Sequence, residues 1–156
     1  MSTQEPNQPL DRRRFLAGSA GVALVSLLPV SALATETDLQ AAVNELFGDK
    51  PIAEGGVAAK LPPLAENGYS VPLSIEVDSP MTETEHVRRI AVFSPRNPIP
   101  NLIQFTLGPR AGLAKVSTRV RLAGTQALLV VAEMSDGTLR SAAPKTMVTL
   151  AACVLE

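Results

Sequence analysis

The chain has 156 residues, with 14 basic and 15 acidic side chains and a formal net charge of −1 at pH 7. This balance and an aromatic content of 3% argue against nucleic-acid binding, which relies on basic surfaces and on aromatic rings that stack with bases. One histidine and one cysteine do not make the three or four ligands of a zinc or copper site. No glycine-rich phosphate loop is present, so we predict neither a metal nor another cofactor.

Residues 1–34 are predicted to be a cleaved twin-arginine export signal. An R-R-x-F-L pattern is followed by an apolar run over 17–30 and by a small-x-small cleavage site. The run is shorter than the ~20 residues that span a bilayer, so we expect a periplasmic protein without stable membrane insertion. An uncleaved N-terminal anchor is the alternative. The recognition residues are Arg12, Arg13, Phe15 and Leu16, and the cleavage residues are Ala32 and Ala34.

The remaining residues, 35–156, have the length of a single domain. Removing the signal leaves 11 basic and 13 acidic side chains, a net charge of −2. Their first segment, 35–48, is predicted to be an amphipathic helix. Thr37 and Gln40 form a capping box, and Gly48 provides the C-terminal stop.

The rest of the domain reads as about eight short strands separated by turn signals, which is typical of a β-sandwich. We therefore predict an all-β, immunoglobulin-like antiparallel β-sandwich preceded by one helix. The expected strands are 57–61, 71–77, 86–93, 102–107, 114–122, 126–133, 138–142 and 146–155.

Particular residues refine these strands. Pro72 marks its strand as an edge strand or a bulge. The segment 114–122 alternates strictly, and 126–133 is apolar throughout, as expected of a strand covered on both faces. Two turns are predicted, at 66–68 and, as a hairpin, at 135–137.

Few side chains are candidates for acid–base catalysis or for covalent attachment of a ligand. His86 lies at a strand entrance among charged residues, and we interpret it as solvated rather than catalytic. Glu66 and Asp78 adjoin turn formers, which explains both without an acid–base pair. Cys153 is unpaired in a chain predicted to enter an oxidising compartment, which indicates either a thiol with a function or a cysteine buried in the core.

Several segments in one order resemble SoxY, the sulfur-carrier family of the periplasmic thiosulfate-oxidising (Sox) system. They are 45–48 (ELFG), 61–68 (LPPLAENG), 77–82 (VDSPMT), 116–122 (VSTRVRL) and 131–137 (VAEMSDG). The resemblance implies a carrier rather than an enzyme, with sulfur intermediates attached covalently to Cys153. It also implies a SoxZ-like subunit as heterodimer partner, and delivery to the Sox cytochrome, hydrolase and sulfur dehydrogenase components.

The C-terminal arm departs from that family. Where SoxY proteins have Gly-Gly-Cys-Gly-Gly, this chain has Ala-Ala-Cys-Val-Leu-Glu over 151–156. Glycine reaches backbone conformations that these residues avoid, so we expect a longer final strand and a less reactive thiol, next to the negative charges of Glu156 and the terminal carboxylate. The alternative is a SoxY-like paralogue that acts as a binding or structural partner without a swinging arm, with a Cys153-linked homodimer as a variant.

Overall fold

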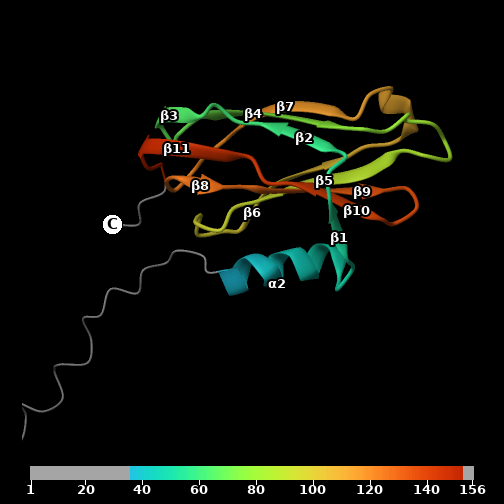
Figure 1. Ribbon diagram of the computed structural model, residues 1–156, viewed down its shortest axis with the longest axis horizontal. Helices are drawn as coiled ribbons and strands as arrows, with labels where there is room; N and C mark the ends of the chain where they lie inside the picture. The colour runs from blue at the N-terminus through green and yellow to red at the C-terminus, as the bar shows by residue number, and fades with distance from the viewer. Residues whose placement is uncertain (1–35, 153–156) are drawn as a thin grey trace, which may run out of the picture. The chain divides into compact units, whose positions relative to one another are not determined.

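The computed structural model describes residues 36–152 (Figure 1). Within this range it has one α-helix, α2 (Glu36–Phe47), one 3-10 turn, η1 (Pro109–Ala111), and eleven strands. The strands are β1 (Ile52–Glu54), β2 (Val57–Lys60), β3 (Leu64–Asn67), β4 (Val71–Val77), β5 (Val87–Phe93), β6 (Asn101–Thr106), β7 (Lys115–Val120), β8 (Gln126–Ala127), β9 (Leu129–Met134), β10 (Leu139–Ala142) and β11 (Lys145–Leu150).

The strands form a sandwich. A five-stranded sheet has the order β1-β10-β9-β5-β6, and two three-stranded sheets have the orders β2-β4-β7 and β3-β11-β8. Figure 1 shows β2, β4 and β7 in one layer, β5, β9 and β10 in the other, and α2 beneath the second layer. The pairs β1–β10 and β3–β11 are parallel, and the other pairs are antiparallel. The prediction of an all-β immunoglobulin-like sandwich after one helix is confirmed.

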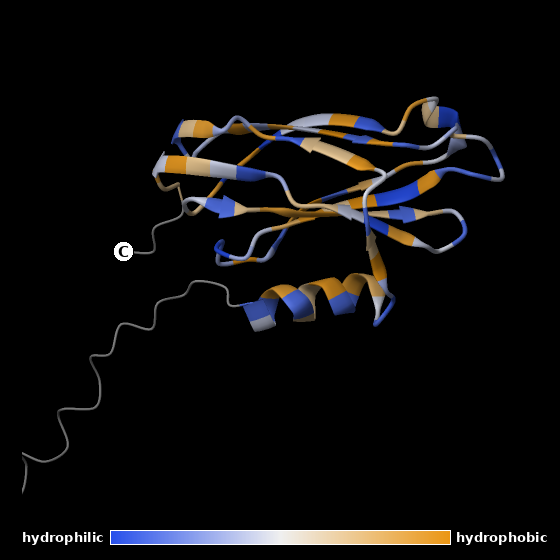
Figure 2. Cartoon of the chain, viewed as in Figure 1, coloured by the Kyte–Doolittle hydropathy of each residue, from blue (hydrophilic) through white to orange (hydrophobic). Residues whose placement is uncertain are grey.

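The main core lies between the two layers. Period-two alternation places one side of each strand inward, and β4 buries all four of its odd-numbered residues, from Val71 to Val77. In β7, Val120 is buried whereas Lys115, Ser117 and Arg119 face solvent, as the alternation predicted. Figure 2 shows the same alternation as changing hydropathy along the strands.

A second, smaller core lies between α2 and the outer face of the five-stranded sheet. Val43 and Phe47 of the helix pack against Ala91, Phe93 and Val131. The rings of Phe47 and Phe93 meet edge to face, with centroids 6.3 Å apart. Strand β9 is therefore covered on both faces, as its continuous apolar run predicted.

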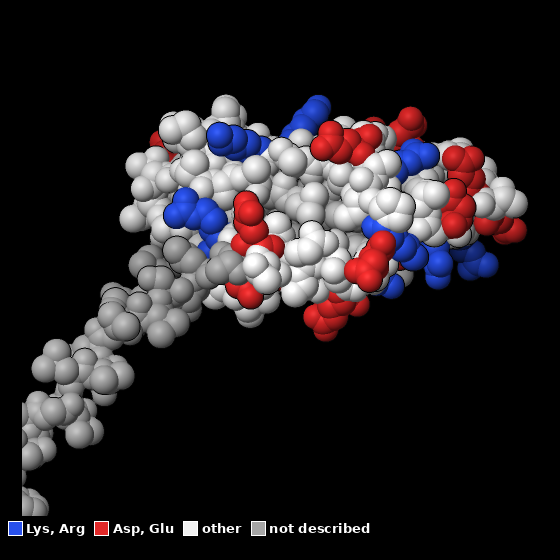
Figure 3. Space-filling view, turned by 60° about the horizontal axis from the view of Figure 1, so that its bottom comes forward, with Lys and Arg blue, Asp and Glu red and all other residues white. Residues whose placement is uncertain are grey.

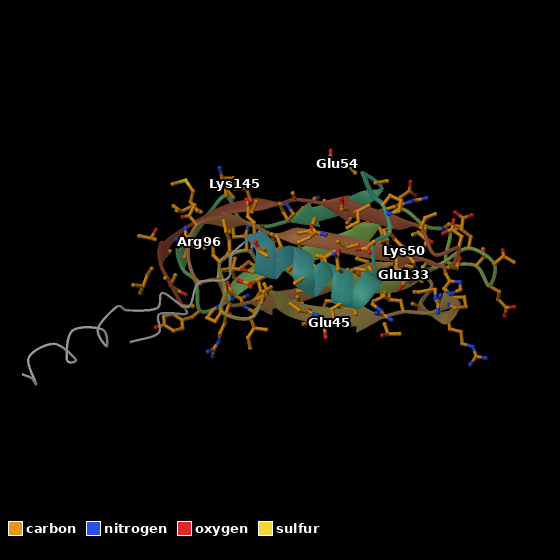
Figure 4. The ribbon with its side chains drawn as sticks, turned by 90° about the horizontal axis from the view of Figure 1, so that it is seen from below. Glu45, Lys50, Glu54, Arg96, Glu133 and Lys145 are labelled. Atoms are coloured by element: carbon orange, nitrogen blue, oxygen red, sulfur yellow. The ribbon has the colours of Figure 1, made fainter. Side chains whose placement is uncertain are left out.

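Ion pairs bind the segment after α2 to this sheet. The ammonium group of Lys50 lies 3.5 Å from the carboxylate of Glu133, which also lies 3.8 Å from the Nε of Arg89. Figure 4 shows Lys50 and Glu133 next to each other near the C-terminal end of α2. Gly48 ends the helix at a φ of 69° and donates its N–H to the carbonyl of Asn44, which confirms the predicted stop.

The structure corrects several strand predictions. Pro72 does not mark an edge strand or a bulge, because β4 is the central strand of its sheet. Pairing with β2 ends at Ser74, so Pro72 faces a partner strand on one side only, where it pairs with Arg119. On the other side no strand pairs with Pro72, so the absence of its N–H breaks no ladder hydrogen bond there.

Two further differences concern the C-terminal half. The predicted strand 126–133 is divided at Leu128: β8 pairs with β11, whereas β9 pairs with β5 and β10. The predicted strand 146–155 ends at Leu150, because its neighbour β3 ends at Asn67, opposite Leu150. Strands β1 and β3 have no counterpart among the predicted strands. No helix within 36–152 is long and apolar enough to cross a bilayer.

Candidate functional site

The residue predicted to carry sulfur lies just beyond the part of the chain that the structure describes. Cys153 is outside residues 36–152, as are the signal residues. Within the described residues, the candidate site therefore consists of Ala152, which directly precedes Cys153, and of the residues that hold Ala152 in place. The other residues outside the described range are Arg12, Arg13, Phe15, Leu16, Ala32 and Ala34.

Backbone hydrogen bonds hold the chain at the point where it leaves the sandwich. The N–H of Ala152 donates to the carbonyl oxygen of Leu122 over 3.0 Å, and the N–H of Leu122 donates to the carbonyl oxygen of Gly68 over 2.9 Å. The N–H of Gly68 donates in turn to the carbonyl oxygen of Leu150 over 2.7 Å. We call Gly68, Leu122 and Ala152 the exit anchor, because together they hold the backbone up to the residue before Cys153.

Gly68 has a steric role in the exit anchor. A Cβ at this position would clash with the carbonyl oxygen of Leu122 and would lie 3.0 Å from the nitrogen of Ala152. The close approach of three backbone segments therefore requires glycine. The sequence signal for this residue was the Asn67-Gly68 pair, which we interpreted as a turn alone.

A side chain supports β11 on its other edge. The hydroxyl oxygen of Thr125 accepts a hydrogen bond from the N–H of Val148 over 2.9 Å. At the start of the same strand, the buried hydroxyl of Thr146 donates to the carbonyl oxygen of Pro62 over 2.7 Å. Strand β11 is thus held by side chains as well as by β3 and β8.

A buried polar cluster stiffens the segment that contains Leu122. The amide oxygen of Asn97 accepts from the N–H of Ala123 over 3.0 Å, and its amide nitrogen donates to the carbonyl of Arg121 over 2.8 Å. The hydroxyl of Ser94 bonds to the amide oxygens of Asn97 and of Gln126. Each of these three side chains is at least 95% buried. Among the described residues, no buried side-chain polar atom lacks a partner, so the cluster is fully satisfied.

Two arginines place positive charge beside the exit anchor. Arg96 donates from Nη1 to the carbonyl of Thr125 over 2.9 Å. Arg119 donates from Nε to the hydroxyl of Ser70 over 2.6 Å and from Nη2 to the carbonyl of Ser70 over 3.0 Å. Figure 4 shows Arg96 toward one end of the sandwich. Over the wider face in Figure 3, acidic and basic side chains are interspersed, so the positive charge is local rather than part of a basic surface.

The structure does not bring His86 to the exit anchor. Its Nδ1 lies 3.1 Å from the carbonyl oxygen of Thr82, in the turn before β5. The polar cluster begins at Ser94, directly after β5. The seven residues of β5 separate these two ends by about 20 Å.

The acidic residues considered from sequence also lie apart from one another. Glu66 is exposed on the edge strand β3, and Asp78 is exposed with its backbone bonded to Gly56 and Arg140. Asp136 accepts two hydrogen bonds from Thr138, and the hydroxyl of Thr138 is the main cause that lowers the pKa of this carboxyl. Asp136 therefore stabilises the hairpin turn at 135–137. Within 36–152, no three histidine, cysteine or acidic side chains gather as metal ligands would.

Comparisons with known proteins identify the relatives of this chain. The family model described as sulfur oxidation protein SoxY matches residues 43–153. The solved structure of the sulfur carrier protein SoxY from Chlorobium limicola f thiosulfatophilum is 32% identical, with a TM-score of 0.63, over 74% of this chain and 100% of that chain.

A more distant likeness concerns the fold alone. A superoxide reductase (neelaredoxin) from Ignicoccus hospitalis has a TM-score of 0.53 at 16% identity, over 60% of this chain and 80% of that chain. A comparison with curated proteins finds no match. The family match includes both the exit anchor and Cys153, so it extends over the whole candidate site.

Proposed function

Because this chain belongs to the SoxY family of sulfur oxidation proteins, we propose that it is a periplasmic sulfur carrier that holds sulfur intermediates covalently on Cys153. The observation that carries the proposal is that the family match extends through Cys153, the one cysteine of the chain. The protein is on this proposal a substrate-bearing subunit and not an enzyme.

The chemistry requires only a thiol. A thiolate is a good nucleophile, and sulfur–sulfur bonds exchange readily, so a cysteine can hold sulfur as a persulfide or as an S-thiosulfonate. Coupling of the Cys153 thiol to the outer sulfur of thiosulfate forms one S–S bond, releases one proton and transfers two electrons to a haem acceptor. We assign the role of acceptor to the Sox cytochrome component.

The surroundings of the exit anchor support an anionic cargo. Arg96 and Arg119 are held by backbone and hydroxyl oxygens on the segments that contact Ala152. A thiosulfonate on the next residue would be attracted by these guanidinium groups, which bind oxyanions well. Both arginines are exposed, so water and salt screen this attraction and the effect is modest.

The partners and the compartment follow from the same proposal. A SoxZ-like subunit would form the heterodimer, and the Sox cytochrome, hydrolase and sulfur dehydrogenase would act on the cargo. Export would use the twin-arginine signal. Replacing Arg12 and Arg13 by lysine should retain the protein in the cytoplasmic fraction, whereas accumulation in the periplasm despite both replacements would contradict this route.

Mass spectrometry tests the carrier role directly. Protein purified from periplasm after growth on thiosulfate should carry added mass on the peptide that contains Cys153, and reduction should remove that mass. The Cys153→Ser variant is the matched control and should show no adduct. Repeated absence of any adduct on the wild-type protein would rule out the carrier role.

A second candidate function is a binding partner without a working arm. It is favoured by the absence of glycine around Cys153 and by the hydrogen bond that holds Ala152. On this reading the sandwich still pairs with a SoxZ-like subunit or with itself. Cys153→Ser would then leave thiosulfate oxidation intact in cells in which deletion of the whole gene impairs it.

A further inference from the structure

The strands at the edges of the sheets differ in how well their free edges are protected. An edge strand presents unpaired N–H and C=O groups, and proteins prevent unwanted pairing by keeping such strands short or by placing charges or proline on them. Among the described edge strands, β1 has three residues, β2 and β3 have four each, and β8 has two. Strand β7 has six residues, but its exposed Lys115 and Arg119 protect it. Strand β6 has neither kind of protection.

Strand β6 is a long, uncharged edge. Its six residues, Asn-Leu-Ile-Gln-Phe-Thr over 101–106, include no charge and no proline. The strand pairs with β5 alone, and no backbone hydrogen bond joins these six residues to any other part of the chain within 36–152. Uncharged six-residue segments of this kind add further strands readily and aggregate when they are left open. We therefore expect the free edge of β6 to be covered in the working protein.

The apolar side chains of β6 are incompletely buried along the same edge. Ile103 and Phe105 pack against the main core but remain partly exposed. Their register partners on β5, Val92 and Ile90, are 0% exposed. The core is thus closed at β5 and open at β6. A strand added beside β6 would complete the burial of both side chains.

An open cleft at the start of β6 extends this edge. Its volume is about 290 Å³, and it is lined by Asn97, Pro98, Ile99, Asn101 and Leu102. Ile99 is 72% exposed at this cleft. Pockets beside a sheet edge accept alternate side chains of an added strand and give the pairing its specificity. The cleft is therefore suited to an apolar side chain from a strand bound along β6.

Charge argues against a second copy of this chain as the occupant. The segment 86–132 has seven basic residues and no acidic one. Exposed arginines adjoin both ends of β6: Arg96 precedes the strand, whereas Arg88, whose carbonyl accepts the N–H of Leu107, and Arg110 adjoin its far end. Glu45 lies on this side too (Figure 4), but on α2, outside the sheet. Self-pairing in either direction would bring arginines together, so a strand flanked by acidic side chains is the better complement.

The need for lasting cover selects among the other proposed partners. Enzymes that act on the cargo would bind only during turnover and would leave the edge of β6 open between encounters. A subunit that stays bound covers the edge at all times. Of the partners in the proposed function, the SoxZ-like subunit is the one with this property.

We propose that the SoxZ-like subunit adds an uncharged strand, flanked by acidic side chains, to the free edge of β6. This inference rests on the proposed function, which includes the heterodimer, and it adds the strand, the cleft and the charge of the contact. The five-stranded sheet would become a six-stranded sheet that crosses the subunit boundary. Strands β6 and β11 belong to different sheets, so the contact does not require the exit anchor.

Hydrogen exchange tests the proposal without any substitution. A purified SoxZ-like subunit is added to the exported protein, and backbone amide exchange is compared before and after. The amides of 101–106 that face away from β5 should exchange about tenfold more slowly or less in the complex. Strand β7 is the internal control, because it is an edge strand of the same length. Protection at β7 or elsewhere, with β6 unchanged, would overturn the proposal.

Matched substitutions on the two edges measure the contribution of β6 to affinity. Gln104→Lys places a charge on β6, and Ser117→Lys places the same charge on β7; both side chains are exposed, and a thermal melt verifies each fold. Gln104→Lys should weaken binding of the SoxZ-like subunit about tenfold, which corresponds to about 1.4 kcal/mol. Ser117→Lys should bind like the wild type. Equal affinity of the two variants would contradict the proposal.

A second pair of variants tests the acidic flanks. Arg110→Gln should weaken binding about threefold and reduce its dependence on salt, because the guanidinium would lie at the rim of the contact. Lys145→Gln on β11 is the control and should change neither quantity. Unchanged affinity and salt dependence in Arg110→Gln would remove the charge argument for an acidic partner.

Two further outcomes separate the causes of a negative result. If the SoxZ-like subunit does not bind the wild-type protein at all, the proposed heterodimer fails and this inference fails with it, whereas the adduct on Cys153 still tests the carrier role. If the amides of β6 become protected in the isolated protein as its concentration rises, a second copy of this chain occupies the edge. Sedimentation equilibrium would then show the dimer, and the SoxZ-like subunit would be overturned as occupant.

Discussion

The two outer faces of the sandwich differ in how far their apolar side chains are exposed to solvent. On the five-stranded sheet, Ala91, Phe93 and Val131 are completely buried because α2 covers them. On the β3–β11 face, Leu64 and Met147 remain 56% and 59% exposed. Both faces have apolar side chains on adjacent strands, so the difference lies in the cover and not in the strands themselves.

This difference separates a covered face from an open face. The covered face gains from burial of apolar area, at roughly 25 cal/mol per Å². The open face gains nothing of this kind in the isolated protein, yet it adjoins the exit anchor.

The largest predicted effect tests the covered face. Phe93→Ala removes a ring that is 0% exposed and that contacts Phe47, and it should lower the free energy of unfolding by about 3–5 kcal/mol. Met147→Ala on the open face should change it by only about 0.5 kcal/mol. Urea denaturation of both variants measures the contrast, and similar losses of stability in the two would contradict the division into a covered and an open face.

The next effect tests the exit anchor. Gly68→Ala introduces a Cβ that clashes with the carbonyl oxygen of Leu122, and the overpacking should cost about 1–3 kcal/mol. The amide of Ala152 should also exchange its hydrogen faster. Gly108→Ala is the control, because Gly108 has extended backbone with a φ of −147° and no atom within 4 Å of an added Cβ. Unchanged exchange at Ala152 in Gly68→Ala would disprove the anchoring role.

A smaller effect is expected at the other edge of β11. Thr125→Val removes the oxygen that accepts the N–H of Val148 and should lower the free energy of unfolding by about 1 kcal/mol. Thr125→Ser keeps the hydroxyl and should be close to neutral. Thermal unfolding of the pair resolves this difference, and equal melting temperatures for the two variants would show that the hydroxyl does not hold the strand.

The smallest effect concerns pH and lies away from both faces. The hydrogen bonds from Thr138 lower the pKa of Asp136, so the folded state favours the carboxylate. Its contribution to stability is present above the pKa of the unfolded chain and is lost as pH falls through the lower folded pKa. Asp136→Asn should flatten the acid limb of the stability curve slightly, as followed by urea midpoints across the acidic range. A steeper acid limb in Asp136→Asn would contradict the stabilising role assigned to the Asp136 carboxylate.

Local patterns predicted much of this molecule. The helix, its stop at Gly48, the alternation in β4 and β7 and the hairpin at 135–137 are each determined by residues close together in the chain. The sulfur-carrier family was predicted from matching segments, and the family match confirms it. The attachment of sulfur to Cys153 and the export by the twin-arginine route remain predictions.

Residues that act through distant neighbours were not predicted. Strands β1 and β3 are short and pair in parallel with strands far along the chain, and no local signal distinguishes such segments from loops. Gly68 was interpreted as a turn residue because its contacts with Leu122 and Ala152 are formed only after folding. The exposure of Met147 could not be predicted from the sequence either. Alternation shows that a residue points outward but not whether another element covers it.

The sequence alone thus determined the class of fold, the family and the identity of the thiol, because periodicity, turn residues and composition are local properties. The tertiary structure alone decided where β11 ends, how Ala152 is held and which apolar face stays open. These features depend on pairing between segments that are far apart in the chain, such as Gly68 with Leu122 and Leu150. The proposed cargo residue therefore follows from the sequence, and the exit anchor that precedes it follows from the fold.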